Sequence, residues 1–225
     1  GTELSEPCIS KKSAELSVSN ETGYNDTTRF LKNIIGLWMI QETRRQFIRE
    51  GKEYSYADME RLAKEAKPFA GFIDPDEPRF TPPGNQLKRI REYLKETGQN
   101  EPASDGEIIR IIYESLAMKY KYTVNSLKEC TGKDFKAIHM VGGGIKDGFL
   151  CQLTADATGM EVIAGPAEAT AAGNIAVQLI ALGEIKDISE ARKIIRDSFD
   201  TKVYKPQNNG FDNEYEKYIK VTGGN

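Results

Sequence analysis

The residues whose types and spacing could do chemistry lie in one glycine-rich stretch, residues 137–159. A short apolar run over 137–141 has the length of a buried strand and leads into three consecutive glycines, 142–144. Glycine has no Cβ, so the backbone there can turn sharply and let a ligand approach closely. An amphipathic segment ending at Gly159 follows, and unpaired N–H groups at the start of a helix suit a phosphate. The pattern predicts either a ligand site or a bare strand-to-helix turn.

Two stricter phosphate motifs are absent from this stretch. A Walker A loop, GxxxxGK[ST], fails because no Lys followed by Ser or Thr comes after Gly144. A dinucleotide fingerprint needs a third glycine where Asp147 stands, and an acidic residue at the end of the next strand, where the chain reads Ala164-Gly165. The loop is therefore a candidate nucleotide site of another design, or no site.

The composition excludes several function classes. One His and three cysteines without a CxxC pair argue against a structural zinc site, and a lone helix Cys is more often a core residue than a nucleophile. Lys and Arg are spread along the helices at a net charge of −3, which argues against a nucleic-acid partner. No apolar run approaches the ~20 residues of a membrane helix, and the first residues of the sequence do not show the pattern of a signal peptide. The expectation is a reduced, cytoplasmic protein.

The elements that must position the loop read as one α/β domain over residues 1–225. Helical spacing predicts a helix from Phe30 to about Gly51. On that helix Asn33 and Gln41 would face one side, since eight residues advance ~12 Å along the helix axis and ~80° around it. Further helices are expected over 55–66, 87–97 and 104–132; Ser55 and Ser104 are the expected N-caps of the first and last.

The remaining elements are shorter. We expect strands over 15–19, 161–164 and 203–206, a turn over 20–27, and a helix over 213–221 followed by a loose tail from about 222. Pro166 is expected in the first turn of a helix whose small residues allow close packing, and Ser189 is expected to cap the next helix. The carboxylates of the proline-rich loop, Asp74, Asp76 and Glu77, are expected to be solvated turn residues rather than a metal site.

Several sequence blocks follow one another along almost the whole chain: Phe30-Leu-Lys-Asn-Ile-Ile-Gly-Leu-Trp38 with Gln41, Asp76-Glu-Pro-Arg-Phe80, Glu96-Thr-Gly-Gln99, Glu114-Ser-Leu-Ala117, His139-Met-Val-Gly-Gly-Gly144, Gln152-Leu-Thr-Ala-Asp-Ala157, Val162-Ile-Ala-Gly-Pro166, Glu168-Ala-Thr170 and Gly173-Asn174. Together they resemble the carboxy-terminal domain of the FGGY family of carbohydrate kinases, and within it the members that phosphorylate L-rhamnulose.

The resemblance implies an actin-like ATPase (ribonuclease H-like) domain, the carboxy-terminal half of a two-domain kinase. Such enzymes transfer the γ-phosphate of ATP, with Mg²⁺, to a sugar hydroxyl, here the 1-hydroxyl of L-rhamnulose. Their partners are therefore ATP, a small sugar and the amino-terminal domain of the same chain. The general base, an aspartate, is implied to lie upstream of Gly1, so no catalytic residue and no metal ligand is expected in these 225 residues, and they are expected to be inactive alone.

The resemblance also implies roles for individual residues. Gly142, Gly143 and Gly144 match the loop that contacts ATP, with Gly143 the matching glycine, and Gln41 matches a further ATP contact. Asn33 matches a substrate contact. Asp147 stands where the family usually has Asn near the adenine; it can accept a hydrogen bond from the adenine amino group but cannot donate one.

Two alternatives remain open at this point. One is a kinase for another ketose, such as fuculose or xylulose, because sugar choice is set mainly in the other half. The other is an actin-like nucleotide-binding domain without transfer chemistry.

Overall fold

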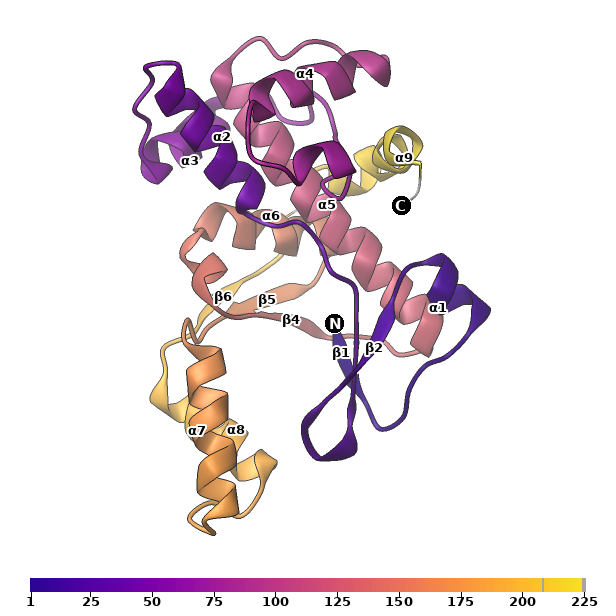
Figure 1. Cartoon of the computed structure of the whole chain (residues 1–225), viewed down its shortest axis with the longest axis vertical. Helices are drawn as coiled ribbons and strands as arrows, with labels where there is room; N and C mark the ends of the chain where they lie inside the picture. The colour runs from indigo at the N-terminus through magenta and orange to yellow at the C-terminus, as the bar shows by residue number, and fades with distance from the viewer. Residues whose placement is uncertain (208, 224–225) are drawn as a thin grey trace. The chain divides into compact units, whose positions relative to one another are not determined.

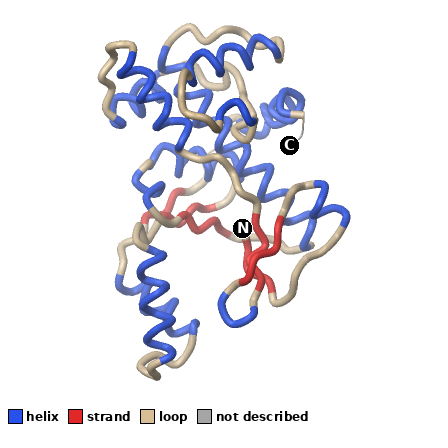
Figure 2. The backbone as a smooth tube through the Cα atoms, viewed as in Figure 1, coloured by secondary structure: helices blue, strands red, loops and turns tan. Residues whose placement is uncertain are grey.

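The structure, a computed structural model of the chain, describes residues 1–207 and 209–223. Its backbone forms two compact units, unit 1 comprising Gly1–Asp134 with Asn208–Asn225 and unit 2 comprising Phe135–Gln207. Each unit combines helices with a three-stranded sheet (Figures 1 and 2), so the α/β class is confirmed. The assignment of residues 1–225 to one domain stays a prediction.

Unit 1 is mainly helical. Its helices are α1 (Lys11–Glu15), α2 (Trp38–Arg49), α3 (Tyr56–Glu65), α4 (Gln86–Glu96), α5 (Asp105–Thr131) and α9 (Phe211–Thr222), with 3₁₀ turns η1 (Tyr24–Asp26) and η2 (Pro78–Phe80). The predicted caps are present. Ser55 and Asp58 form a capping box on α3, the Ser104 side chain accepts from the Glu107 N–H, and Gly132 ends α5 in a left-handed conformation. Local chemistry therefore fixes these helix ends.

Helix α5 is the central element of unit 1. Its apolar side chains Ile108, Ile112 and Leu116 are fully buried, and it packs extensively on α3. A Cβ at Gly106 would lie 2.6 Å from the backbone oxygen of Leu62, so the absence of a side chain there permits the close approach of α3. Helix α9 also packs on α5 (Figure 1).

The first 31 residues of unit 1 differ from the sequence-based expectation. Strands β1 (Thr2–Leu4), β2 (Ser19–Thr22) and β3 (Thr28–Leu31) form an antiparallel sheet in the order β1-β3-β2. The strand expected over 15–19 and the helix expected from Phe30 were both wrong. Phe30 is fully buried in the central strand, alternating with exposed Arg29, and helix α2 begins only at Trp38. The spacing of the apolar residues also fitted a helix, but pairing of residues 28–31 with a strand on each side determined the structure.

Unit 2 has a sheet in the order β4-β5-β6, with β4 (Ala137–Met140) parallel to β5 (Glu161–Ala164) and β6 (Lys202–Tyr204) antiparallel to β5. These are the strands that the sequence predicted, within a few residues. Strand β4 is an edge strand and only partly buried, with His139 exposed, so the expectation of a buried strand was wrong. Helix α6 (Gly148–Thr158) packs on β5 and β6 and ends at left-handed Gly159 (Figure 1).

Helices α7 (Ala169–Ala181) and α8 (Ile188–Ser198) pack on each other (Figure 1) around a small apolar cluster, Ala176, Ile185 and Ala191. Two cap predictions were wrong. Pro166 lies before α7, whose N-cap is Glu168, and α8 is capped by Asp187 rather than Ser189. The close packing expected for the small residues of α7 is also not observed, because Ala176 is the one described α7 residue that is buried.

The terminal helix is confirmed and slightly longer than predicted. Helix α9 extends to Thr222, and Gly223 caps it in a left-handed conformation. The loose tail predicted from about 222 therefore falls partly on this ordered end, and its last residues, 224 and 225, lie outside the described residues.

Candidate functional site

The glycine loop of unit 2 lies between β4 and α6. Gly142 follows the strand with φ of 83° and ψ of −172°, a conformation open to glycine, and η3 (Gly143–Lys146) forms a single 3₁₀ turn. The Gly142 N–H donates to the Pro166 oxygen (3.2 Å), and the Gly165 N–H donates to the Met140 oxygen (2.8 Å). The loops that follow the two parallel strands are therefore tied together at the carboxyl edge of the sheet, where open α/β sheets bind ligands.

Gly143 has a feature that packing does not explain. Apart from its neighbours along the chain, a Cβ at this position would meet no atom of the described residues within 4 Å, and its backbone is not in the left-handed region. In contrast, a Cβ at Gly165 would lie 2.9 Å from the Asp200 oxygen, so that glycine is required by packing. The fold therefore leaves open space beside Gly143, which a ligand could occupy against bare backbone.

Asp147 has a structural role that the sequence analysis missed. Its Oδ1 accepts a hydrogen bond from the Leu150 N–H (2.9 Å), which makes it the N-cap of α6. The helix thus begins after Asp147, and Gly143 and Gly144 lie in the 3₁₀ turn that precedes it. The signal was available, because Asp is a preferred N-cap residue just before a segment with helical apolar spacing. A contact between Asp147 and adenine stays a prediction.

Cys151 is a core residue, as expected. It is fully buried among Ala155, Val162 and Tyr204, and burial raises the pKa of its thiol to about 11. A thiol with that pKa is almost entirely protonated at neutral pH and is a poor nucleophile.

Asn33 and Gln41 belong to unit 1 and do not share a helix. Gln41 lies in the first turn of α2 and is exposed. Asn33 is exposed in the irregular segment 32–36, between β3 and α2. The expectation that one helix turns both amides to one side was therefore wrong. The structure does bring Gly142, Gly143, Gly144 and Asp147 together in one loop of unit 2.

The carboxylates of the proline-rich loop are not simply solvated, contrary to expectation. Asp74 is buried, and its Oδ1 lies 2.9 Å from Nζ of Lys119, which is 1% exposed. Asp76 is one quarter exposed, and its Oδ2 lies 3.0 Å from the same Nζ. Burial, and then the positive charge of Lys119, lower the pKa of Lys32. Sequence spacing gave no signal for this cluster, because Lys119 lies more than 40 residues from both carboxylates.

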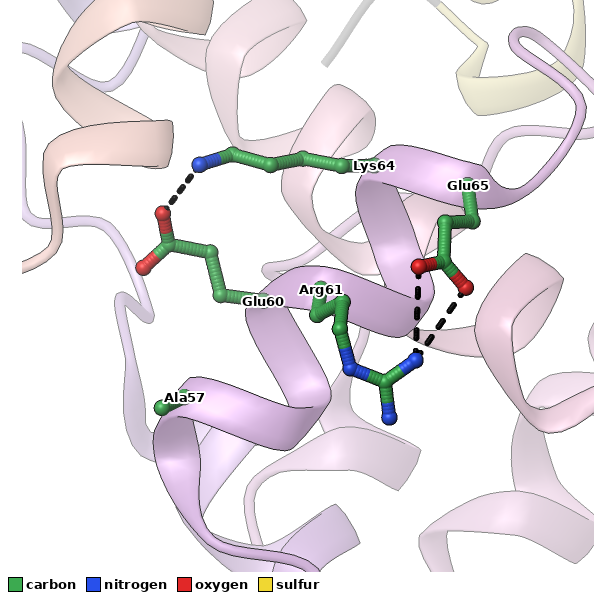
Figure 3. Close-up of a pocket in the computed structure, with 5 residues that line it drawn as sticks. All are labelled: Ala57, Glu60, Arg61, Lys64 and Glu65. Atoms are coloured by element: carbon green, nitrogen blue, oxygen red, sulfur yellow. Dashed lines mark hydrogen bonds and ion pairs between the residues drawn. The ribbon is translucent and has the colours of Figure 1, made fainter.

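Two hollows of the described surface lie away from the glycine loop. One of about 450 Å³ is lined entirely by residues of α3, where Lys64 pairs with Glu60 and Arg61 with Glu65 (Figure 3). Another of about 410 Å³ lies at the end of α4 beside Gln99. Neither includes a predicted site residue. The α3 hollow is bordered by ion pairs one helical turn apart, which are ordinary on an exposed helix face.

The residues described here include no cluster of three His, Cys, Asp or Glu side chains that could hold a metal ion. Within the same residues, no helix is both long and apolar enough to span a bilayer.

The comparison with protein families identifies the fold. A model of the C-terminal domain of the FGGY family of carbohydrate kinases matches residues 1–182. The chain belongs to the FGGY family of carbohydrate kinases. The family match extends over both units and includes the glycine loop, Asn33 and Gln41.

Curated FGGY relatives are similar at the level of sequence. The rhamnulokinase of Bacillus subtilis is 43% identical over 207 residues, which cover 92% of this chain and 42% of that protein. The rhamnulokinase of Halalkalibacterium halodurans is 46% identical over 204 residues, 91% of this chain and 43% of that protein. The chain thus spans less than half the length of these relatives.

Solved FGGY kinases share the fold. A ligand-bound xylulose kinase and a gluconate kinase, both from Lactobacillus acidophilus, each match with a TM-score of 0.70, covering 98% of this chain and 44% of theirs. Their identities of 15% and 16% support a likeness of fold alone. The predicted fold, a carboxy-terminal actin-like ATPase domain, is confirmed.

Proposed function

We propose that the chain is the ATP-binding half of a kinase that transfers the γ-phosphate of ATP to the 1-hydroxyl of L-rhamnulose. The sugar is supported by relatives named rhamnulokinase at 42–46% identity. The ATP site is supported above all by the place of the glycine loop at the carboxyl edge of the sheet, where Gly143 leaves open space that neither backbone strain nor packing accounts for. A cytoplasmic location also stays a prediction.

In this proposal the chain's residues bind and orient rather than react. The backbone of Gly142, Gly143 and Gly144 holds the adenosine end of ATP, Gln41 makes a further contact to ATP, and Asn33 contacts the sugar. Phosphoryl transfer depends mostly on positioning the substrates and on neutralising the charge of the phosphates, so side-chain amides and backbone N–H groups are suitable binding groups. Mg²⁺ supplies charge neutralisation at the phosphates when bound. The general base is an aspartate of the amino-terminal half.

The test is Gly143→Ala in the full-length enzyme that carries this chain. A methyl group there clashes with none of the described residues, so we expect this domain to fold normally, but the methyl would fill the space that the nucleotide needs. We expect the KM for ATP to rise at least tenfold, about 1.4 kcal/mol, with little change in the KM for sugar.

Gly173→Ala is the matched control. Gly173 lies in α7, and a Cβ there also meets no atom within 4 Å. We expect wild-type kinetics from this control. An unchanged KM for ATP in Gly143→Ala would remove the loop from the ATP site.

The same enzyme distinguishes the alternatives. Phosphorylation rates with L-rhamnulose, fuculose and xylulose would identify the sugar, and the highest kcat/KM for another ketose would overturn the rhamnulose assignment. ATP binding without transfer to any sugar would favour a nucleotide-binding domain without transfer chemistry.

A further inference from the structure

The segment that carries Asn33 has no regular secondary structure, yet its backbone is anchored. Residues 32–36 follow strand β3, in which Thr28 and Phe30 are buried, and lead toward helix α2. In the middle of this connection, the Ile35 N–H donates to Oδ1 of Asp76 (2.9 Å). Ile35 is two residues from Asn33, a distance of at most about 7 Å along an extended chain. The anchor is therefore close enough to control where the Asn33 side chain lies.

Asp76 is itself held by a buried charge. Its second oxygen, Oδ2, lies 3.0 Å from Nζ of Lys119, and that lysine is fixed from the other side by Asp74 Oδ1 at 2.9 Å. The Asp76 N–H also donates to Asp74 Oδ1 (3.1 Å). Lys119 extends from the central helix α5 and is 1% exposed. An ion buried to this degree is strongly destabilising unless it keeps its partners, so the carboxylates cannot easily move away.

The loop that carries the two carboxylates is rigid for a further reason. Side chains of α5 bind its backbone: the Phe69 N–H donates to Oε2 of Glu114 (2.8 Å), and the Ile73 N–H donates to Oγ of Ser115 (3.0 Å). Both acceptors are fully buried. A continuous path of direct contacts thus runs from α5 through the loop to Ile35.

We propose that Asp76 is a positioning residue for Asn33, because its two oxygens join the Asn33 segment to the buried Lys119 of α5. This inference rests on the proposed sugar contact of Asn33. It predicts that sugar recognition depends on the hydrogen bond between Ile35 and Asp76, since a misplacement of about 1 Å can cost up to about 100-fold in rate.

The experiment compares Asp76→Ala and Asp76→Asn in the full-length enzyme. Ala removes the acceptor for the Ile35 N–H, whereas Asn can keep its amide oxygen there, with an NH2 group replacing the oxygen that faces Lys119. We expect Asp76→Ala to raise the KM for sugar about tenfold with the KM for ATP nearly unchanged. Asp76→Asn should restore a KM for sugar within about threefold of the wild type, even if it is as unstable as Asp76→Ala. Equal KM values for the two variants would overturn the proposal.

A control and a double-mutant cycle separate this proposal from the sugar contact itself. Glu77→Gln removes a neighbouring charge of the same loop, one that pairs with Arg79 (3.3 Å), and should leave the KM for sugar unchanged. If Asp76 acts through Asn33, the effects of Asp76→Ala and Asn33→Ala should not add in the double variant. No effect of Asn33→Ala would contradict the proposed sugar contact. A clear effect of Asn33→Ala that adds to that of Asp76→Ala would overturn the positioning role alone.

Discussion

At the scale of single residues, the candidate site combines positions with very different structural constraints. Gly143 is free of packing constraints, so the nucleotide proposal can be tested there without disturbing the fold. Asp147 has a local structural role, because it caps α6 while lying in the loop that is proposed to bind ATP. Any effect of changing Asp147 must therefore be divided between the helix and the ligand.

Two substitutions at Asp147 separate its effect on the stability of helix α6 from its effect on ATP binding. Asp147→Asn keeps a side-chain oxygen for the Leu150 N–H and should leave thermal stability almost unchanged, since Asn and Asp are comparable N-caps. Asp147→Ala should lower the free energy of unfolding by about 1 kcal/mol. If Asp147 is near the adenine, Asp147→Asn should still change the KM for ATP, because it removes a negative charge and adds a donor. Thermal melts and ATP kinetics of both variants check this; identical ATP kinetics in wild type and Asp147→Asn would place the side chain away from the base.

At the scale of elements, α2 is fixed by a buried carboxylate one residue after Gln41. Glu42 is fully buried and accepts from the Gly84 N–H (3.0 Å), while Arg45 and Arg49 each contact one of its oxygens at 3.0 Å. Burial opposes the ionised form, but the hydrogen bonds from Gly84 and the two guanidinium groups outweigh it and lower the pKa of Glu42. The network joins α2 to the end of the proline-rich loop.

The lowered pKa predicts how this stabilisation depends on pH. A folded pKa below the unfolded value of about 4.3 means that the contribution is complete above that pH and is lost as the pH falls through the folded pKa. Glu42→Gln should be less stable than the wild type by about 2 kcal/mol at pH 7, and the difference should shrink below about pH 4.3. Urea unfolding from pH 7 to pH 3 measures it. A difference that stays constant over this range would exclude ionised Glu42 as the source.

The sequence predicted elements where local chemistry decides the structure and failed where distant contacts decide it. The capping residues Ser55 and Ser104 and the terminal Gly159 are local signals, and each was placed correctly. The spacing of Phe30 fitted a helix, but pairing with strands on both sides made it a strand. The contact between Lys119 and Asp76 joins positions 43 residues apart, so no local pattern could reveal it. The roles proposed for Gly143, Gln41 and Asn33 come from the resemblance, and the structure describes only the surroundings of these residues.

At the scale of the whole molecule, the chain covers less than half the length of its curated relatives, and kinase chemistry needs groups from both halves of a cleft. We therefore expect the 225-residue chain alone to show no phosphorylation of L-rhamnulose with ATP. A coupled assay of ADP release, with and without sugar, checks this. The full-length enzyme at the same concentration is the positive control, and sugar-dependent turnover by the chain alone would mean that it holds a general base of its own.

The order of segments along the chain has a consequence for synthesis on the ribosome. Unit 2 occupies one continuous stretch, whereas unit 1 needs α9, whose Tyr218 is fully buried against Phe72 and whose Phe211 meets Phe69 edge-on. Chains fold during synthesis as their segments emerge. The core of unit 1 therefore stays incomplete, with aromatic side chains uncovered, until unit 2 has been made and residue 218 has left the exit tunnel. A protein that ends just before α9 would keep these aromatic side chains uncovered, and exposed apolar surface of this kind promotes aggregation.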